Sequence, residues 1–308
     1  MSFIFTPDLI INQIINGLTI GAIYALIALG YTLVYGILLM INFAHGEIFM
    51  VGAFGGWFVL SRLFQTGFAG NHAALSIIMA FIGGMAASAA LGILVERVAY
   101  RPLRKAPRLS PLICAIGVSI FLQNVVMVFA KAKTEFYPNV FPEGTLDVSS
   151  ISISYFQIFI ISGSVLMMAA LYVFVKKSKT GKAMRAVAED KDTAALMGVN
   201  VNRIIAVTFA VGSAAAAVAG VMVGMYYGQI NHMMGFVPGI KAFTAAVLGG
   251  IGNMPGAMVG GYVLGVAETL AVLVLPAQYK DVVAFSLLVL ILIFRPRGIM
   301  GEVVAQRA

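Results

Sequence analysis

Long apolar runs alternate with short polar breaks along the whole chain. A helix needs roughly 20 mostly apolar residues to cross a bilayer. Eight runs reach or approach that length, and they predict an all-α, polytopic integral membrane protein with about eight transmembrane segments. These runs are residues 9–40, 45–61, 73–95, 111–130, 152–175, 204–228, 240–275 and 279–294.

The composition extends this picture over the full length. Of the 308 residues, 61% are hydrophobic and only 10% are charged, whereas soluble domains carry about 25% charged residues. We therefore expect a single transmembrane domain over residues 1–308. The net charge of +8 does not indicate nucleic acid, because the basic residues lie between apolar runs instead of on one folded face. The lone Cys114 excludes an intramolecular disulfide framework and a cysteine metal cluster.

The basic residues predict the orientation of the chain. Fifteen of the 20 Lys and Arg fall within residues 97–108, 176–203 and 295–307. The excess of Lys and Arg in cytoplasmic loops places these blocks, and with them the C-terminus, in the cytoplasm. The segments between them, such as residues 131–151, then face outward. With no basic residue before Arg62, a cleavable signal peptide is not indicated, and the first apolar run should remain as a membrane helix.

A count of crossings predicts a re-entrant pair near the C-terminus. Residues 203 and 295 are both expected inside, so an even number of full crossings must separate them, yet three apolar runs lie between. The middle run contains "LGGIGNMPGAMVGG" (248–261), whose six glycines and one proline break a helix. We expect a half-helix at 241–248, an elbow, and a second helix at 256–275 that returns to the same side.

A second break, "INFAHGE" (41–47), interrupts the first apolar region in a similar way. It aligns with the later break after a one-residue slip, and paired interruptions in two halves are typical of transporters with internal repeats. The alternative is an ordinary cytoplasmic turn, with the N-terminus outside and residues 9–40 forming one long tilted crossing. In either case Asn42 or His45 could cap the helix that starts near Gly46, with Glu47 in its first turn.

The polar residues show no catalytic constellation. His45 and Glu47 are two apart and would point to different sides of a helix. Gly181-Lys182 resembles part of a phosphate-binding loop, but Lys176 and Ala183 stand where that loop needs Gly and Ser or Thr. We expect a chain that is not an enzyme and that holds no cofactor or metal.

Polar residues within the apolar runs are candidates for a route across the membrane. Irregular backbone at membrane depth survives only where protein covers it or water reaches it, and ionisable residues there usually mark a pathway. Two further acidic residues raise questions of pairing. Glu96 could pair with Arg97, and Glu268 could line the route or pair with Lys280 or with a neighbouring subunit. The candidates for the translocation path, or for caps of the broken helices, are Asn42, His45, Glu47 and Asn253.

Residues 176–203 form the longest polar stretch between membrane runs. They predict two short helices, with Thr180 capping the first, Asp190 or Asp192 capping the second, and Gly198 ending it. Small alanine faces would let these helices seat in a partner's groove, with Arg185, Glu189 and Asp190 at the rim. The alternative is a solvated loop with an amphipathic helix on the lipid headgroups.

Five motifs resemble, in the same order, permeases of ABC importers of the branched-chain amino acid type, closest to the LivH-type subunit. The resemblance runs from about residue 16 to 301, and the related permeases for urea, short amides and sugars are more distant by these motifs. The motifs are "INFAHGE", "ERVAYRPLR" (96–104), "AIGVSIFLQN" (115–124), "GKAMRAVAEDKDTAALMGVNVNRIIAVTFAVGSAAAAVAG" (181–220) and "KAFTAAVLGGIGNMPGAMVGG" (241–261).

The resemblance implies a subunit of a larger assembly in the bacterial inner membrane. Such a permease leaves ATP hydrolysis to two ATPase subunits, pairs with a second permease (LivM-type or a second copy), and receives an amino acid from a periplasmic binding protein. A helix N-terminus aimed at the path would favour a substrate carboxylate, and an apolar path would suit Leu, Ile or Val. The segment around residues 186–198 would seat in the ATPase groove. The implied coupling residues are Gly181, Arg185, Ala186, Glu189, Asp190, Ala194, Ala195 and Gly198.

Two competing functions remain open at this stage. A related permease for urea or short amides would share the fold. A self-sufficient secondary carrier or channel would usually need intramembrane charge pairs for ion coupling, and it would not need the docking segment.

Overall fold

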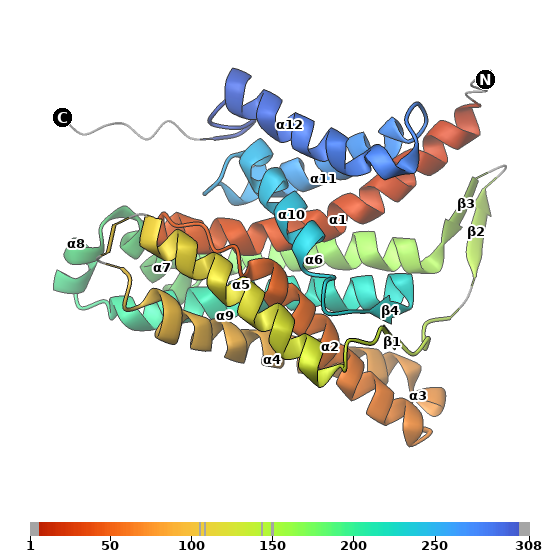
Figure 1. Ribbon diagram of the computed structural model, residues 1–308, viewed down its shortest axis with the longest axis horizontal. Coiled ribbons are helices and arrows are strands. Elements are labelled where there is room, and N and C mark those ends of the chain that lie inside the picture. Colours follow the sequence, from red (N-terminus) through yellow and green to blue (C-terminus); the bar gives the residue numbers. More distant parts are fainter. Residues whose placement is uncertain (1–5, 105, 108, 143, 149–150, 302–308) are drawn as a thin grey trace.

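The computed structural model describes residues 6–301, apart from residues 105, 108, 143, 149 and 150. The basic residues Lys105, Arg108 and Arg307, which contribute to the orientation argument, lie outside the described residues. The rest of the chain forms a bundle of long helices with short strands at one end (Figure 1).

Long helices dominate the described part of the chain. Seven of them are long and apolar enough to cross a membrane, and one bent pair could form an eighth span. The prediction of an all-α polytopic membrane protein is therefore confirmed. The long helices are α1 (Pro7–Leu38), α2 (His45–Gln65), α4 (Ala73–Val95), α5 (Leu109–Phe129), α6 (Tyr155–Lys177), α9 (Val201–Tyr227) and α12 (Lys280–Phe294), and the bent pair is α10 (Phe236–Gly249) and α11 (Met254–Ala271).

Short elements lie at the two ends of the bundle (Figure 1). At one end, α7 (Lys179–Glu189) and α8 (Lys191–Leu196) form the predicted pair within residues 176–203, and the π-helix η1 (Glu96–Tyr100) extends α4. At the other end lie α3 (Phe68–Asn71), the 3₁₀ turn η2 (Ala277–Tyr279) and two small antiparallel sheets. β1 (Glu135–Phe136) pairs with β4 (Gln229–Ile230), and β2 (Thr145–Val148) pairs with β3 (Ile151–Ser154).

α1 forms the core of the bundle and packs against α9 and α11. Small residues line this contact. A methyl group at Gly261 would lie 2.5 Å from the Cα of Ala25, and one at Gly265 would lie 2.4 Å from the Cα of Gly21. Because lipid tails are as apolar as side chains, membrane helices associate largely through such close backbone packing.

The break between α10 and α11 bends the chain by 120°. Gly250 and Gly252 adopt φ angles of +110° and +96°, a region that residues with a side chain rarely occupy. Asn253 caps α11 by accepting a hydrogen bond from the Gly256 N–H at 3.0 Å, and its amide donates to the Met300 carbonyl at 2.9 Å. A sharply bent helix pair at the predicted place is confirmed, with helices that span 236–249 and 254–271 instead of 241–248 and 256–275. The return of the second helix to the same side of the membrane stays a prediction.

The first break has a different shape. α1 is one 32-residue helix that starts at the end of the bundle with the β2–β3 hairpin and finishes at the end with α7 and α8 (Figure 1). α2 does not start level with the end of α1. Its first residue, His45, packs against Gly30, which lies eight residues, or about 12 Å, before the last residue of α1. The six residues 39–44 therefore fold back into the bundle before α2 begins.

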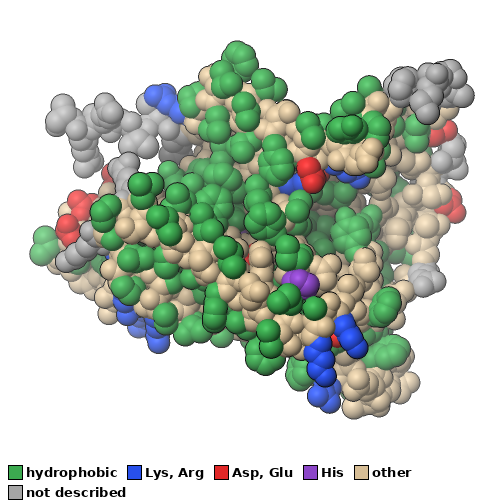
Figure 2. All heavy atoms as spheres, viewed as in Figure 1, with side chains coloured by type: hydrophobic (Ala, Val, Ile, Leu, Met, Phe, Trp, Pro, Cys, Tyr) green, Lys and Arg blue, Asp and Glu red, His purple; other side chains and the backbone are tan. Residues whose placement is uncertain are grey.

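The surface has the charge distribution of a membrane protein. In Figure 2, hydrophobic side chains cover the middle of the visible face, and acidic and basic side chains gather toward its two ends. An acidic and a basic side chain also lie in the hollow beneath α12 (Figure 2). The apolar band is the part that a lipid bilayer or a neighbouring membrane subunit can cover.

Candidate functional site

A cavity of about 290 Å³ lies where α2 and α10 begin, with α1 and α5 beside it. Its wall is mainly apolar and includes Phe43, Ile116, Ile120 and Ile240. Ile116 and Ile120 are about half exposed on α5, so the cavity is bounded by a wall at the surface of the bundle.

Glu47 is the one charged residue among the described residues that line this cavity. Its side chain is 1% exposed. Its Oε1 accepts a hydrogen bond from the Gln123 amide at 2.7 Å and one from the Ser119 hydroxyl at 3.2 Å. Its Oε2 is buried and has no hydrogen-bond partner among the described residues. One oxygen of this carboxylate thus has hydrogen-bond donors on α5, and the other oxygen has no partner among the described residues.

Glycines bring the starts of α2 and α10 into direct contact. A methyl group at Gly46 would lie 2.4 Å from the Gly235 carbonyl oxygen, and one at Gly239 would lie 2.9 Å from the Gly46 Cα. Glu47 stands in the first turn of α2, and a methyl group at Gly235 would lie 2.9 Å from its Oε2. Helix N-termini carry a partial positive charge. Two of them therefore stabilise a negative charge at this position.

Asn42 and His45 support the break and do not line the cavity. Asn42 is buried and accepts a hydrogen bond from the Tyr100 hydroxyl at 2.8 Å. His45 makes an edge contact with the Tyr31 ring, with centroids 4.7 Å apart. The N-cap of α2 is Ala44, and no side chain caps this helix. The prediction that Asn42 or His45 caps it is therefore wrong, because tertiary partners take up both side chains.

Asn253 lies away from this cavity, at the elbow between α10 and α11. The elbow, with the ends of α6 and α7, borders an open groove of about 620 Å³ that Arg185 and Lys176 also line. The four predicted path or helix-break residues thus separate into one cavity residue, Glu47, and three residues that hold the two breaks.

α7 and α8 have the predicted two-helix form. Asp190 caps α8 by accepting from the N–H groups of Asp192 and Thr193, both at 2.8 Å, and Gly198 follows the helix with a φ angle of +83°. These two predictions are confirmed. Thr180 does not cap α7, because Ser178 accepts the hydrogen bond from the Gly181 N–H at 2.9 Å. The helix begins two residues earlier than the Thr180 cap would require.

The predicted coupling residues divide into an attached set and an exposed set. Gly181 and Ala194 are buried against the body, and Arg185 donates hydrogen bonds to the carbonyls of Val175 and Lys176 at the end of α6. Two large apolar side chains at the tip, Leu196 and Met197, are 88% and 80% exposed. The exposed residues among the predicted set are Ala186, Glu189, Asp190, Ala195 and Gly198, together with Arg185, whose hydrogen bonds to α6 leave its side chain exposed.

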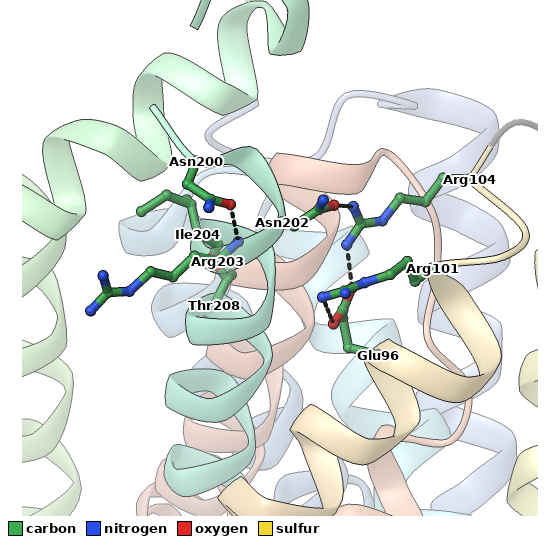
Figure 3. Close-up of polar contacts among 8 residues, drawn as sticks. All are labelled: Glu96, Arg101, Arg104, Asn200, Asn202, Arg203, Ile204 and Thr208. Carbon is green, nitrogen blue, oxygen red and sulfur yellow. Dashed lines mark hydrogen bonds and ion pairs between the residues drawn. The ribbon is translucent and has the colours of Figure 1, made fainter. Parts of the chain in front are cut away.

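A cluster of ionic contacts connects α4 to the start of α9 (Figure 3). Glu96 is fully buried, and both Arg101, at 3.1 Å, and Arg104 form ion pairs with it. Arg104 also donates a hydrogen bond to the Asn202 side chain at 2.6 Å. The predicted pair of Glu96 with Arg97 is wrong. Neighbouring residues on a helix point about 100° apart, and it is the turn after η1 that folds Arg101 and Arg104 back over Glu96.

This cluster lies next to α8. Burial, together with the positive charge of Arg104, lowers the pKa of the Lys191 ammonium at the start of α8. Asn202, whose side chain accepts the hydrogen bond from Arg104, belongs to the first turn of α9, the helix that follows α8. The start of α8 therefore lies beside the contacts that hold α4 to α9.

A second buried cluster joins α10, α11 and α12. The Lys241 ammonium lies 3.1 Å from the Glu268 carboxylate and 2.7 Å from the Asp281 carboxylate. The Tyr24 hydroxyl donates to Glu268 at 3.1 Å. The partner of Glu268 is thus Lys241, and not Lys280 as one sequence alternative held.

Sequence reasoning missed several residues of these sites. Ser119 and Gln123 stand four apart in "AIGVSIFLQN" and so share one helix face, a signal that was available. Lys241 is a lone cation in an apolar run, which calls for a buried partner. The role of Tyr100 had no local signal, because its partner Asn42 is 58 residues away in the chain.

Membrane-spanning helices with two breaks, the first of which borders an apolar cavity, together with a pair of short helices at one end, define a multi-pass membrane permease. Comparison with protein families gives the particular family. The family described as "Branched-chain amino acid transport system / permease component" matches residues 13–292, and the chain belongs to it.

Individual relatives agree with this assignment. The chain is 51% identical to the high-affinity branched-chain amino acid transport system permease protein BraD of Pseudomonas aeruginosa, over 95% of this chain and 96% of the relative. It is 48% identical to the protein LivH of the same description from Escherichia coli K12, over the same shares. The autoinducer 2 import system permease protein LsrC of Yersinia enterocolitica is 27% identical, over 74% of this chain and 62% of the relative.

Proposed function

We propose that this chain is the membrane permease subunit of an ATP-driven importer that carries the branched-chain amino acids Leu, Ile and Val into the bacterial cytoplasm. The full-length likeness to BraD and LivH supports the substrate class. The single structural observation that carries the proposal is the cavity between α2 and α10. Its wall is mainly apolar, and its volume of about 290 Å³ lies near the lower end of the range for small-molecule pockets, about 300–1,000 Å³.

The translocation path follows the first helix break. Glu47 faces the substrate, while Asn42 and His45 hold the break and Asn253 holds the elbow. Ile116 and Ile120 form an apolar wall at the surface of α5. That surface would face the second permease subunit, LivM-type or a second copy, so the path runs along the contact between two permeases.

α7 and α8 form the coupling segment. Two ATPase subunits would bind on this side of the membrane, and the exposed tip with Leu196 and Met197 would enter an ATPase groove. Arg185 contacts α6 and borders the groove beside Asn253. A shift of α7 therefore reaches the elbow, and through α10 it reaches the cavity wall. In this arrangement the C-terminus is cytoplasmic, and the periplasmic binding protein delivers the substrate on the opposite side.

Reconstitution tests the proposal directly. We expect proteoliposomes that contain this chain, a second permease, two ATPase subunits and the binding protein to accumulate leucine only with ATP. The matched control omits the ATPase subunits and should show no accumulation. Uptake of leucine by this chain alone would contradict the proposal and favour a self-sufficient carrier or channel. ATP-driven uptake of urea or a short amide in place of leucine would redirect the substrate class.

A further inference from the structure

The free half of the Glu47 carboxylate has no explanation within the described part of the chain. Oε1 receives two hydrogen bonds from α5, whereas Oε2 has none. No Lys, Arg or His lines the cavity among the described residues. A buried carboxylate without a counter-charge costs several kcal/mol. The site thus presents a carboxylate oxygen that lacks a partner among the described residues and can pair with a group from outside the chain.

The surrounding backbone is arranged to keep that negative charge. Glu47 stands in the first turn of α2, and its Oε2 lies beside Gly235, the N-cap of α10. The positive ends of two helices therefore meet at one carboxylate. Because Glu47 already occupies these helix ends, they are not free to receive the carboxylate of a substrate. The missing partner is a cation.

We propose that Glu47 binds the α-ammonium group of the transported amino acid through Oε2, while the apolar wall of Ile116, Ile120 and Ile240 holds the side chain. This inference rests on the proposed function, since it identifies the group by which the path recognises its substrate. A charge-assisted hydrogen bond between ammonium and carboxylate is about twice as strong as one between neutral groups. Ser119 and Gln123 are positioning residues that hold the carboxylate toward the cavity.

The proposal predicts that ligands with an ammonium group bind in the cavity and that ligands without one do not. Leucine and 3-methylbutylamine both offer an ammonium and a branched apolar chain, so both should bind in the cavity. The hydroxy acid 2-hydroxy-4-methylpentanoate has the same chain and a carboxylate but no ammonium, so it should not bind. A site built for the carboxylate of the substrate would show the opposite order for the amine and the hydroxy acid.

Protection of a cysteine from alkylation measures this order. In the assembled complex, without the binding protein, Cys114→Ala removes the native thiol and Ile116→Cys places a reporter on the cavity wall. We expect leucine and 3-methylbutylamine to slow the reaction with N-ethylmaleimide at least about three-fold, and the hydroxy acid to leave it unchanged. Equal protection by the hydroxy acid, or no protection by any of the three compounds, would overturn the proposal.

Variants of Glu47 connect the effect to its charge. Glu47→Gln should abolish protection by leucine and by the amine, and Glu47→Asp should retain part of it. Asp147→Asn, on the distant β2–β3 hairpin, is the matched control. In this variant leucine and the amine should protect the reporter cysteine as well as they do without the substitution. Leucine protection that persists in Glu47→Gln would refute the assignment. If Glu47→Gln fails to assemble, the comparison of the three ligands on the parent complex still decides.

Failure here is distinct from failure of the proposed function. The complex with the native Cys114 and Ile116, supplied with binding protein and ATP in proteoliposomes, reports leucine uptake. If leucine is taken up but protection does not depend on the amino group, Glu47 is not the ammonium site and the importer proposal still holds. Absence of ATP-driven uptake would remove the importer itself.

Discussion

Gly21 faces α11 without a side chain, and the backbone of Tyr262 occupies the space that a side chain would need. A methyl group there would lie 2.8 Å from the Tyr262 Cα and 2.9 Å from the Gly261 carbonyl oxygen. Gly36, in the same helix, has no atom within 4 Å of that position. Two glycines of one helix therefore have opposite requirements, and only the neighbouring helix distinguishes them.

We expect Gly21→Ala to destabilise the protein and Gly36→Ala to leave it unchanged or slightly more stable. Overpacking typically costs about 1–3 kcal/mol, whereas alanine in an open helical position gains up to about 1 kcal/mol over glycine. The melting temperature of the detergent-solubilised protein, followed by size-exclusion chromatography after heating, measures both. Equal melting temperatures for the two variants would contradict the close α1–α11 packing.

The sequence identified single polar residues more easily than it identified their partners. Glu47, Glu96 and Glu268 stand out as charges in or beside apolar runs. Their partners lie at sequence distances of 76 residues for Gln123, 8 for Arg104 and 27 for Lys241. Arg97 was wrong because a helix turns neighbouring side chains to different faces, and Lys280 was wrong because Lys241 of α10 pairs with Glu268.

At the scale of elements, the breaks were the most predictable feature. A run of six glycines and a proline cannot continue a helix, and an even number of crossings requires the chain to return. The first break shows the limit of this reasoning. The sequence indicated where α1 ends, but only the structure shows that residues 39–44 fold back and that α2 begins beside Gly30.

The ionic cluster of Figure 3 joins two elements, and its loss should be costly. We expect Arg104→Ala to destabilise the protein by about 1.5–3 kcal/mol, because it removes one of the two arginines that pair with the fully buried Glu96 while Arg101 stays in place. Arg203→Ala is the matched control in the first turn of α9. Its side chain points away from Glu96 (Figure 3), so its effect should stay within about 0.5 kcal/mol.

Thermal unfolding of the two variants in detergent measures this difference. A melting temperature for Arg104→Ala that equals that of Arg203→Ala would show that the ion pair contributes no net stability. Partial recovery in Arg104→Lys, which keeps the charge but loses the fork of donors, would support the geometry of the contact with both Glu96 and Asn202.

For the whole molecule, the long α1 places its first residues at the end of the bundle opposite α7 and α8, and α12 finishes at the same end as those helices (Figure 1). Lys and Arg of residues 176–203 lie at the latter end. With that end in the cytoplasm, the start of α1 lies outside. This arrangement favours one long tilted crossing by the first helix.

Labelling from each side of the membrane tests this orientation. In a Cys114→Ala background we expect Gln65→Cys, at the end of α2, to react with a membrane-impermeant maleimide in spheroplasts. Leu196→Cys, 88% exposed at the tip of α8, should react only after permeabilisation. The reverse pattern would invert the topology. His45 is unsuitable for this assay because it is buried.

The sequence by itself determined the class of protein, the approximate number of membrane segments, the place of both breaks and the two short helices within residues 176–203. These properties depend on local composition and on the length of apolar runs, which lipid selects directly. Tertiary structure alone decided which polar groups meet. Glu47 faces a cavity because glycines let the starts of α2 and α10 come into contact. Asn42 does not line that cavity, and its side chain accepts a hydrogen bond from the Tyr100 hydroxyl. Such contacts depend on close packing between segments far apart in the chain, and no local pattern encodes them.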